Sequence, residues 1–128
     1  MYVFGNANRA YLRDLVKSGI EVKSDKVVIT DKTILKYVKH PKRLKGATVS
    51  TNRFVMVEAA VKHPRNIYID QNRDRIIYVG SVRYSKDKVL KVVIEPNQRI
   101  KGSFYNQVKS IGVVDKIDMN GKQYKKIK

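Results

Sequence analysis

The sequence has no cysteine, no tryptophan, three prolines and two histidines among its 128 residues. Without cysteine there can be no disulfide, thiolate zinc site, iron–sulfur cluster or cysteine nucleophile. The longest apolar runs, such as Ile76–Val79, are far shorter than the ~20 residues that a bilayer span needs. No signal-peptide pattern opens the chain. These absences argue against a membrane-spanning protein and leave the cellular compartment open.

Carboxylates are also scarce, because 28 Lys and Arg stand against 11 Asp and Glu, a net charge of +17. Self-repulsion of this size favours a polyanionic partner such as RNA, DNA or an anionic membrane surface. Residues 1–64 carry 13 basic and 5 acidic side chains, and residues 65–128 carry 15 and 6, so a basic tail does not explain the total. From Lys32 to Val57 there are seven Lys or Arg, one His and no carboxylate. We call this segment the acid-free stretch.

Apolar residues make up 42% of the chain, enough for one core, and the length predicts a single domain over 1–128. We expect an α+β fold, with N-terminal helices packed on one face of a four- to five-stranded antiparallel sheet. Within the domain, 1–25 is predicted to be an N-terminal helical extension. Residues 111–128 are predicted to be a basic C-terminal hairpin, turning at Asn120-Gly121, or a tail.

Caps and apolar periodicity place three helices in the first half of the chain. The predicted helices run from a cap at Asn6 or Asn8 to Gly19, from a cap at Asp31 to His40-Pro41, and from a cap at Ser50 or Thr51 to His63-Pro64. Beyond the helices, alternating apolar residues and turn formers predict an antiparallel meander. The predicted strands are Asn66–Asp70, Arg75–Tyr84, Lys88–Glu95 and Arg99–Asn106, with a short strand at Lys26–Thr30 between the first two helices.

Several kinds of active site have no support in the sequence. The carboxylates are scattered, and the one close pair, Asp70 and Asp74, is more typical of a turn between strands than of a metal site. The GxxxxGK[ST], GxGxxG, GxSxG and HExxH motifs are all missing. We therefore expect no metal and no cofactor. Metal-independent RNA cleavage remains compatible with the composition, since it needs a proton acceptor, a proton donor and cations around the phosphate.

His40 is the better of the two histidines for such proton transfer, because it lies in the acid-free stretch. Neighbouring cations are suited to bind phosphates. The predicted substrate-binding residues of this stretch are Lys39, Lys42, Arg43, Lys45 and Arg53. The alternative is that His40 only ends a helix, which is also the favoured interpretation of His63.

Strand alternation predicts two faces of different character. The apolar face is predicted to hold Tyr78, Val82, Leu90, Val92, Ile94, Ile100 and Phe104. The polar face is predicted to hold Ser81, Arg83, Lys91, Arg99, Lys101, Ser103 and Tyr105, with Arg99 and Lys101 as substrate-binding cations. Such a face suits a phosphate ligand, and it is also what a solvated sheet face looks like.

This order of elements resembles the barnase–EndoU–colicin–RelE (BECR) superfamily of metal-independent RNases, particularly its phage-encoded branch. The likeness covers residues 26–110. It rests on Val28-Ile29-Thr30-Asp31, the helix ending at His40, the passage His63–Tyr68, the strand Leu90–Ile94, and Ser103-Phe104-Tyr105. The resemblance implies an active site built from His40, Arg83, Lys91, Ser103 and Tyr105, with Ser110 as a rival to Ser103.

The resemblance also implies a toxin-like or phage-associated ribonuclease that leaves a 2′,3′-cyclic phosphate. Its expected partners are tRNA or another structured or single-stranded RNA, and an acidic immunity protein or antitoxin. It implies action in a bacterial cytoplasm after delivery by a phage or a secretion system. Two alternatives stay open: a non-enzymatic winged-helix DNA-binding protein, and a phage structural protein. The third predicted helix has almost no polar face, which argues against a DNA-reading helix.

Overall fold

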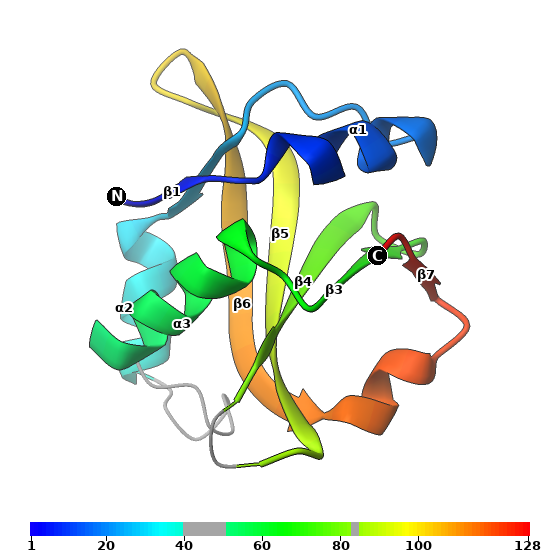
Figure 1. Cartoon of the computed structure of the whole chain (residues 1–128). Helices are drawn as coiled ribbons and strands as arrows, with labels where there is room; N and C mark the ends of the chain where they lie inside the picture. Colours follow the sequence, from blue (N-terminus) through cyan, green and yellow to red (C-terminus); the bar gives the residue numbers. More distant parts are fainter. Residues whose placement is uncertain (40–50, 83–84) are drawn as a thin grey trace.

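The computed structural model describes residues 1–39, 51–82 and 85–128 (Figure 1), and within these ranges it describes all side chains except those of 36–39 and 51–53. One mixed sheet of seven strands, in the order β1-β2-β6-β5-β4-β3-β7, organises the protein. The strands are β1 (Tyr2–Asn6), β2 (Lys26–Ile29), β3 (Asn66–Asp70), β4 (Arg75–Ser81), β5 (Lys88–Ile100), β6 (Ser103–Asp115) and β7 (Tyr124–Lys126). The helices are α1 (Arg9–Lys17), α2 (Asp31–Lys39), α3 (Thr51–Lys62) and the short 3₁₀ helix η2 (Lys116–Asn120).

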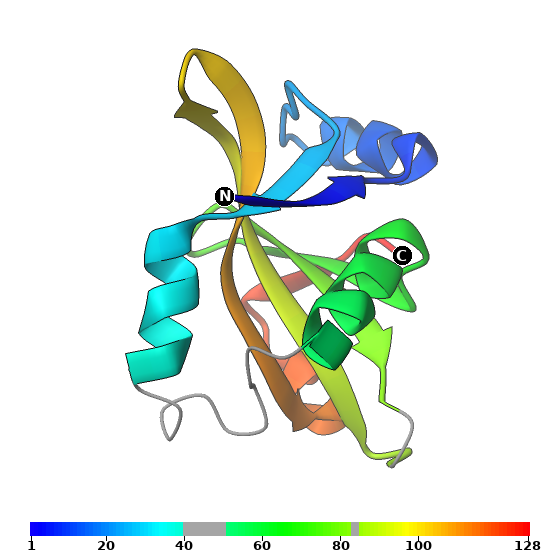
Figure 2. The ribbon, with the colours of Figure 1, turned by 90° about the vertical axis from the view of Figure 1, so that its left-hand side faces the viewer.

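The expected α+β class is confirmed, but the expected sheet is wrong. It has seven strands, and β2 pairs with β6 in the parallel direction, with Val27 opposite Asn106. The helices do not share one face either. Figure 2 shows α3 on one side of the long β5–β6 hairpin and α2 on the other side. The added strands come from both ends of the chain, where β1 pairs with β2 and β7 pairs with β3.

Local capping explains where α1 and α2 begin. The Asn8 side chain accepts a hydrogen bond from the Ala10 amide at 3.0 Å, which confirms Asn8 as the cap of α1. At α2 the predicted cap is wrong, because Thr30 Oγ1, and not Asp31, accepts from the Thr33 amide at 3.4 Å. Asp31 instead accepts from the Met1 amino group at 2.7 Å, and this contact holds the pKa of the Asp31 carboxyl below its usual value.

The β5–β6 hairpin is longer than predicted, since β5 runs on through Pro96 and Asn97 and the chain turns at Lys101-Gly102. The predicted strand Arg99–Asn106 is therefore wrong, and so is the break after Glu95. Asn97 has a φ of 60° at an irregularity between Glu95 and Gln98. Its side chain accepts from the Lys23 amide at 2.7 Å and donates to the Glu21 carbonyl at 2.5 Å. A bulge held by a distant segment thus replaces the expected turn.

The C-terminal segment does not form a hairpin at Asn120-Gly121. Residues Lys116–Asn120 form η2, Gly121 has a φ of −62°, and β7 adds to the sheet beside β3. A type I′ turn requires positive φ at both central residues, and this conformation differs from it. The pairing brings Tyr124 opposite Asp70. The last strand, β7, therefore pairs with β3 and not with β6, the strand that precedes it in the sequence.

Two hydrophobic clusters cover opposite faces of the sheet. The larger one joins α1 and α3 to the sheet, and it confirms the predicted burial of Tyr78, Val82, Leu90, Val92 and Ile94. Ile100 and Phe104 are the exceptions: Ile100 is half-buried and outside this cluster, and Phe104 is 36% exposed, with Lys23 Nζ 4.6 Å from its ring centre. The smaller cluster joins Ile77, Val79 and Val89 to Met119 of η2. In the part of the chain described here, no helix is long and apolar enough to cross a membrane.

Candidate functional site

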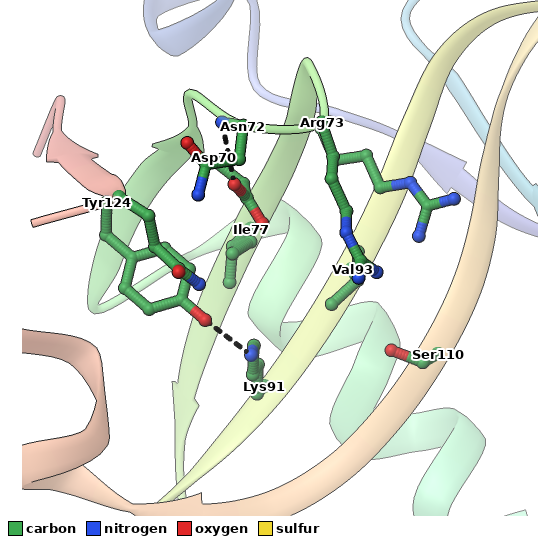
Figure 3. A pocket seen from close by; sticks show the side chains of 10 residues that line it. Asp70, Asn72, Arg73, Ile77, Lys91, Val93, Ser110 and Tyr124 are labelled. Carbon is green, nitrogen blue, oxygen red and sulfur yellow. Dashed lines mark hydrogen bonds between the residues drawn. The ribbon is translucent and has the colours of Figure 1, made fainter. Parts of the chain in front are cut away.

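A polar pocket of about 320 Å³ lies on the sheet face opposite α3. We call it the Lys91 pocket and define it by Asp70, Arg73, Arg75, Lys91, Ser110 and Tyr124. Ile77 and Val93 form an apolar part of its lining. Figure 3 shows Lys91 and the Tyr124 hydroxyl pointing toward each other, with Ser110 on the other side of Lys91 from Tyr124.

Strand pairing brings these side chains together from distant parts of the chain. Tyr124 of β7 stands opposite Asp70 of β3, and Asp70 stands opposite Arg75 of β4. Arg75 Nη2 lies 3.7 Å from Glu95 Oε2 on β5. Cross-strand neighbours share a sheet face, so a phenol, a carboxylate and a guanidinium lie in one row. Ser110 of β6 completes the pocket from the opposite side, opposite Val93.

Lys91 and Tyr124 form the central contact of the pocket. Lys91 Nζ donates to Tyr124 Oη at 3.0 Å, while the ring centre is 5.1 Å from the ammonium, so the hydroxyl is the main partner. Gly112 stands opposite Lys91 on β6, and a Cβ added there would meet nothing within 4 Å. The space next to Gly112, across from the base of the Lys91 side chain, is therefore open. With its oxygen held by Lys91, the Tyr124 hydroxyl can donate its proton to a ligand.

Asp70 supplies the only carboxylate among the described residues that line the pocket. It is 9% exposed, and its Oδ1 accepts from the Asn72 amide at 3.1 Å. This bond confirms the predicted turn-forming role of Asp70, while Asp74 occupies the same turn with a φ of 52°. Among the described residues the second carboxylate oxygen of Asp70 has no hydrogen-bond partner. That oxygen is free to accept a proton.

The site carries an excess of positive charge. Glu95 Oε2 faces two cations, Arg75 at 3.7 Å and Lys109 at 3.6 Å. Within the described parts of the chain, neither Arg73 nor Lys91 has an ion-pair partner. Four cations against the two carboxylates Asp70 and Glu95 leave a net charge of +2. An anionic ligand is therefore favoured over a cationic one.

Of the predicted site residues that the structure describes, only Lys91 lines this pocket. Ser110, the rival candidate, lines it as well, whereas Ser103 pairs with Ile100 beside the β5–β6 turn. Val93 and Ile100, which stand opposite the two serines, lie on the same strand, and at about 3.3 Å per residue the serines are about 23 Å apart along it. Arg99, Lys101 and Tyr105 accompany Ser103 in the hairpin.

The remaining predicted site residues cannot be assigned to this pocket. His40, Lys42, Arg43, Lys45 and Arg83 lie outside the described residues. Lys39 is the last residue of α2, and Arg53 lies in the first turn of α3. His63 is exposed, and its amide donates to the Ala59 carbonyl at 2.8 Å, as its predicted helix-ending role requires.

Sequence reasoning missed Asp70, Arg73, Arg75 and Tyr124 as site residues. Alternation on β4 places Arg75 on the same sheet face as Ile77 and Val79, opposite to the face of the main core. This gives a weak indication from the sequence that Arg75 belongs to the face with the pocket. Tyr124 carries none, because only its pairing with β3 brings it to Asp70. No group of three His, Asp or Glu side chains within the described ranges could hold a metal ion.

The fold and the pocket define an α+β protein with a cationic pocket on a sheet face. Comparison with known proteins found no family model, no curated protein and no solved structure that matches the chain.

Proposed function

We propose that the Lys91 pocket binds an RNA phosphodiester and cleaves it without a metal. The observation that carries the proposal is the Lys91–Tyr124 hydrogen bond of 3.0 Å beside Asp70, Arg73 and Arg75 in a net cationic pocket. Arg73 and Lys91 supply positive charge for the phosphate. Tyr124 supplies a hydroxyl donor, and Asp70 supplies an acceptor. This set contains each group that metal-independent RNA cleavage needs.

In the proposed reaction the ribose 2′-hydroxyl gives its proton to the Asp70 carboxylate as O2′ attacks phosphorus. The bond between phosphorus and O5′ breaks, and O5′ takes the Tyr124 hydroxyl proton. The products are a 2′,3′-cyclic phosphate and a free 5′-hydroxyl. Lys91 holds the Tyr124 oxygen and stabilises the phenolate that forms, because the ammonium lies within hydrogen-bond distance of it. After product release Asp70 gives up its proton to solvent, and the Tyr124 phenolate takes one from solvent, which restores the site.

The resemblance to BECR ribonucleases supports the same activity from sequence alone, with His40 as the proton-transfer group. The DNA-binding alternative has less support. Val57, Ala60 and Val61 of α3 are buried in the main core, so this face of the helix is unavailable to a DNA groove. A winged helix also requires only a two-stranded wing, whereas this sheet has seven strands.

The test is cleavage of a mixed-sequence RNA in EDTA, followed by identification of the product ends. We expect cyclic phosphate ends from the wild-type protein and a loss of about 100-fold or more in rate for Tyr124→Phe, because a positioned proton donor contributes 10²–10⁴-fold. Lys91→Gln should lose activity comparably. Lys26→Gln is the matched control, since Lys26 is an exposed strand lysine on β2.

Two outcomes would contradict this assignment. If the wild-type protein cleaves no RNA, the enzymatic proposal fails. If Tyr105→Phe and Ser103→Ala abolish cleavage while Tyr124→Phe and Ser110→Ala do not, the active site lies in the β5–β6 hairpin. A His40→Ala variant measured alongside tests whether the acid-free stretch takes part in proton transfer.

A further inference from the structure

A second polar cavity, of about 400 Å³, opens between η2 and the β3–β7 edge of the sheet. We call it the Arg65 crevice and define it by Arg65, Asn66, Tyr68, Lys116, Asn120 and Lys126. Val79, Val89 and Met119, from the smaller hydrophobic cluster, also line it. The crevice therefore lies on the same sheet face as the Lys91 pocket.

The charge of the crevice is uncompensated. Three of its lining residues, Arg65, Lys116 and Lys126, are exposed cations, and no carboxylate from the described residues lines it. None of the three has an ion-pair partner in the described portion of the chain. Like charges around one concavity repel each other, so an anion bound there is stabilised by all three.

An aromatic pair connects the two cavities. Tyr68 lines the crevice and Tyr124 lines the Lys91 pocket, and their ring centres lie 6.2 Å apart in an edge contact. Lys126 stands opposite Tyr68 and so faces the crevice, whereas Lys125 stands opposite Ile69, which belongs to the main core on the other face. The two anion sites are neighbours along the strands, on either side of this pair.

We infer that the Arg65 crevice is a second phosphate subsite, so the ligand of this sheet face is a single RNA strand that spans both cavities. The inference rests on the proposed function for the identity of the ligand. A lone phosphate group fills one cavity, whereas a polynucleotide fills both. A single strand fits this arrangement, because its phosphates can bind the cations of both cavities while its unpaired bases meet the aromatic side chains between them, as in other grooves that bind single strands.

The test measures binding of non-cleavable 2′-O-methyl oligonucleotides by fluorescence anisotropy, which separates it from cleavage. The wild-type protein should bind a hexanucleotide more tightly than a dinucleotide. In Arg65→Gln/Lys126→Gln the hexanucleotide should bind about tenfold more weakly, and the slope of log affinity against log salt should fall by about 0.7 per lost phosphate contact. The dinucleotide affinity should stay unchanged.

Arg13→Gln/Lys125→Gln is the control, because it removes the same two charges from exposed positions outside the crevice. Equal weakening by the control, or equal weakening of both oligonucleotides, would overturn the second subsite. Length-dependent binding without any RNA cleavage would support the subsite and reject the enzymatic proposal. Cleavage without length-dependent binding would support the enzymatic proposal and reject the second subsite.

Discussion

Tyr78 shows how much one buried side chain contributes to the chemistry of the core. It is 2% exposed and is among the largest fully buried side chains of the described residues. Burial raises the pKa of its hydroxyl well above the usual value of about 10, because the phenolate has no water around it. The folded protein therefore keeps the Tyr78 proton at a pH where the unfolded chain has lost it.

This difference predicts a loss of stability in alkali. Below the unfolded pKa of about 10, Tyr78 is neutral in both states and adds no pH dependence. Above it, the unfolded chain holds fewer protons, so the free energy of unfolding falls by up to about 1.4 kcal/mol per pH unit. Tyr78→Phe should remove this contribution.

Urea unfolding of both proteins from pH 8 to pH 11 measures it, with the difference between the two curves as the readout. Subtracting one curve from the other cancels the effect of lysine titration on the free energy of unfolding, because both proteins have the same lysines. A constant difference across this range would show that the Tyr78 hydroxyl ionises as readily in the folded state as in the unfolded chain.

At the scale of elements, the sheet depends on close approach between α3 and β4. A Cβ added to Gly80 would lie 2.9 Å from the Cβ of Ala60. This distance is shorter than two carbon atoms tolerate, and both neighbours belong to regular elements. Two small residues therefore set how deeply α3 packs on the sheet, and with it the position of the main core.

Gly80→Ala should consequently destabilise the protein by about 1–3 kcal/mol through overpacking. Ala60→Gly in the same chain should recover part of this loss, although glycine itself costs about 1 kcal/mol in a helix. Gly112→Ala is the control, since a Cβ at that position meets nothing within 4 Å.

Chemical denaturation of the four proteins provides the double-mutant cycle. Additive effects of Gly80→Ala and Ala60→Gly would mean that the two positions do not contact each other in solution.

For the whole molecule, the charge of +17 becomes meaningful through its placement. Part of it surrounds two cavities on one sheet face, where Lys91, Arg73 and the cations of the Arg65 crevice converge. Another part, at Arg99 and Lys101, lies in the far end of the β5–β6 hairpin. A nucleic acid that contacts several of these groups releases counterions from each phosphate it brings.

RNA binding should therefore depend steeply on salt. If each of the two cavities binds one phosphate, as we propose, log affinity should fall against log salt with a slope of about −1.4 or steeper for a single strand. Titrations of a labelled single-stranded RNA between 50 and 300 mM salt, roughly the range in which such slopes are resolved, provide the measurement.

A duplex DNA of the same length is the comparison. Sequence-preferring duplex binding without turnover would favour the DNA-binding alternative. A flat salt dependence for both ligands would contradict any phosphate-based function.

The sequence by itself determined the α+β class, a helix cap at Asn6 or Asn8, the strand Asn66–Asp70 and the apolar face that carries Tyr78, Leu90 and Val92. These features depend on residues a few positions apart, because caps and alternating side chains act over one or two turns or along one strand. The basic excess is likewise a matter of composition.

Only the tertiary structure decided the rest. The bulge at Asn97 is held by Lys23 and Glu21, and Tyr124 reaches Asp70 through a strand pairing between residues far apart in sequence. Turn-forming residues predict a chain reversal after Glu95 and another at Asn120-Gly121. Long-range hydrogen bonds outweigh this local preference at both positions. The candidate site consists of such pairings. Alternation along one strand therefore predicts Lys91, whereas its hydrogen-bond partner Tyr124 and the nearby Asp70 join the site only in the folded chain.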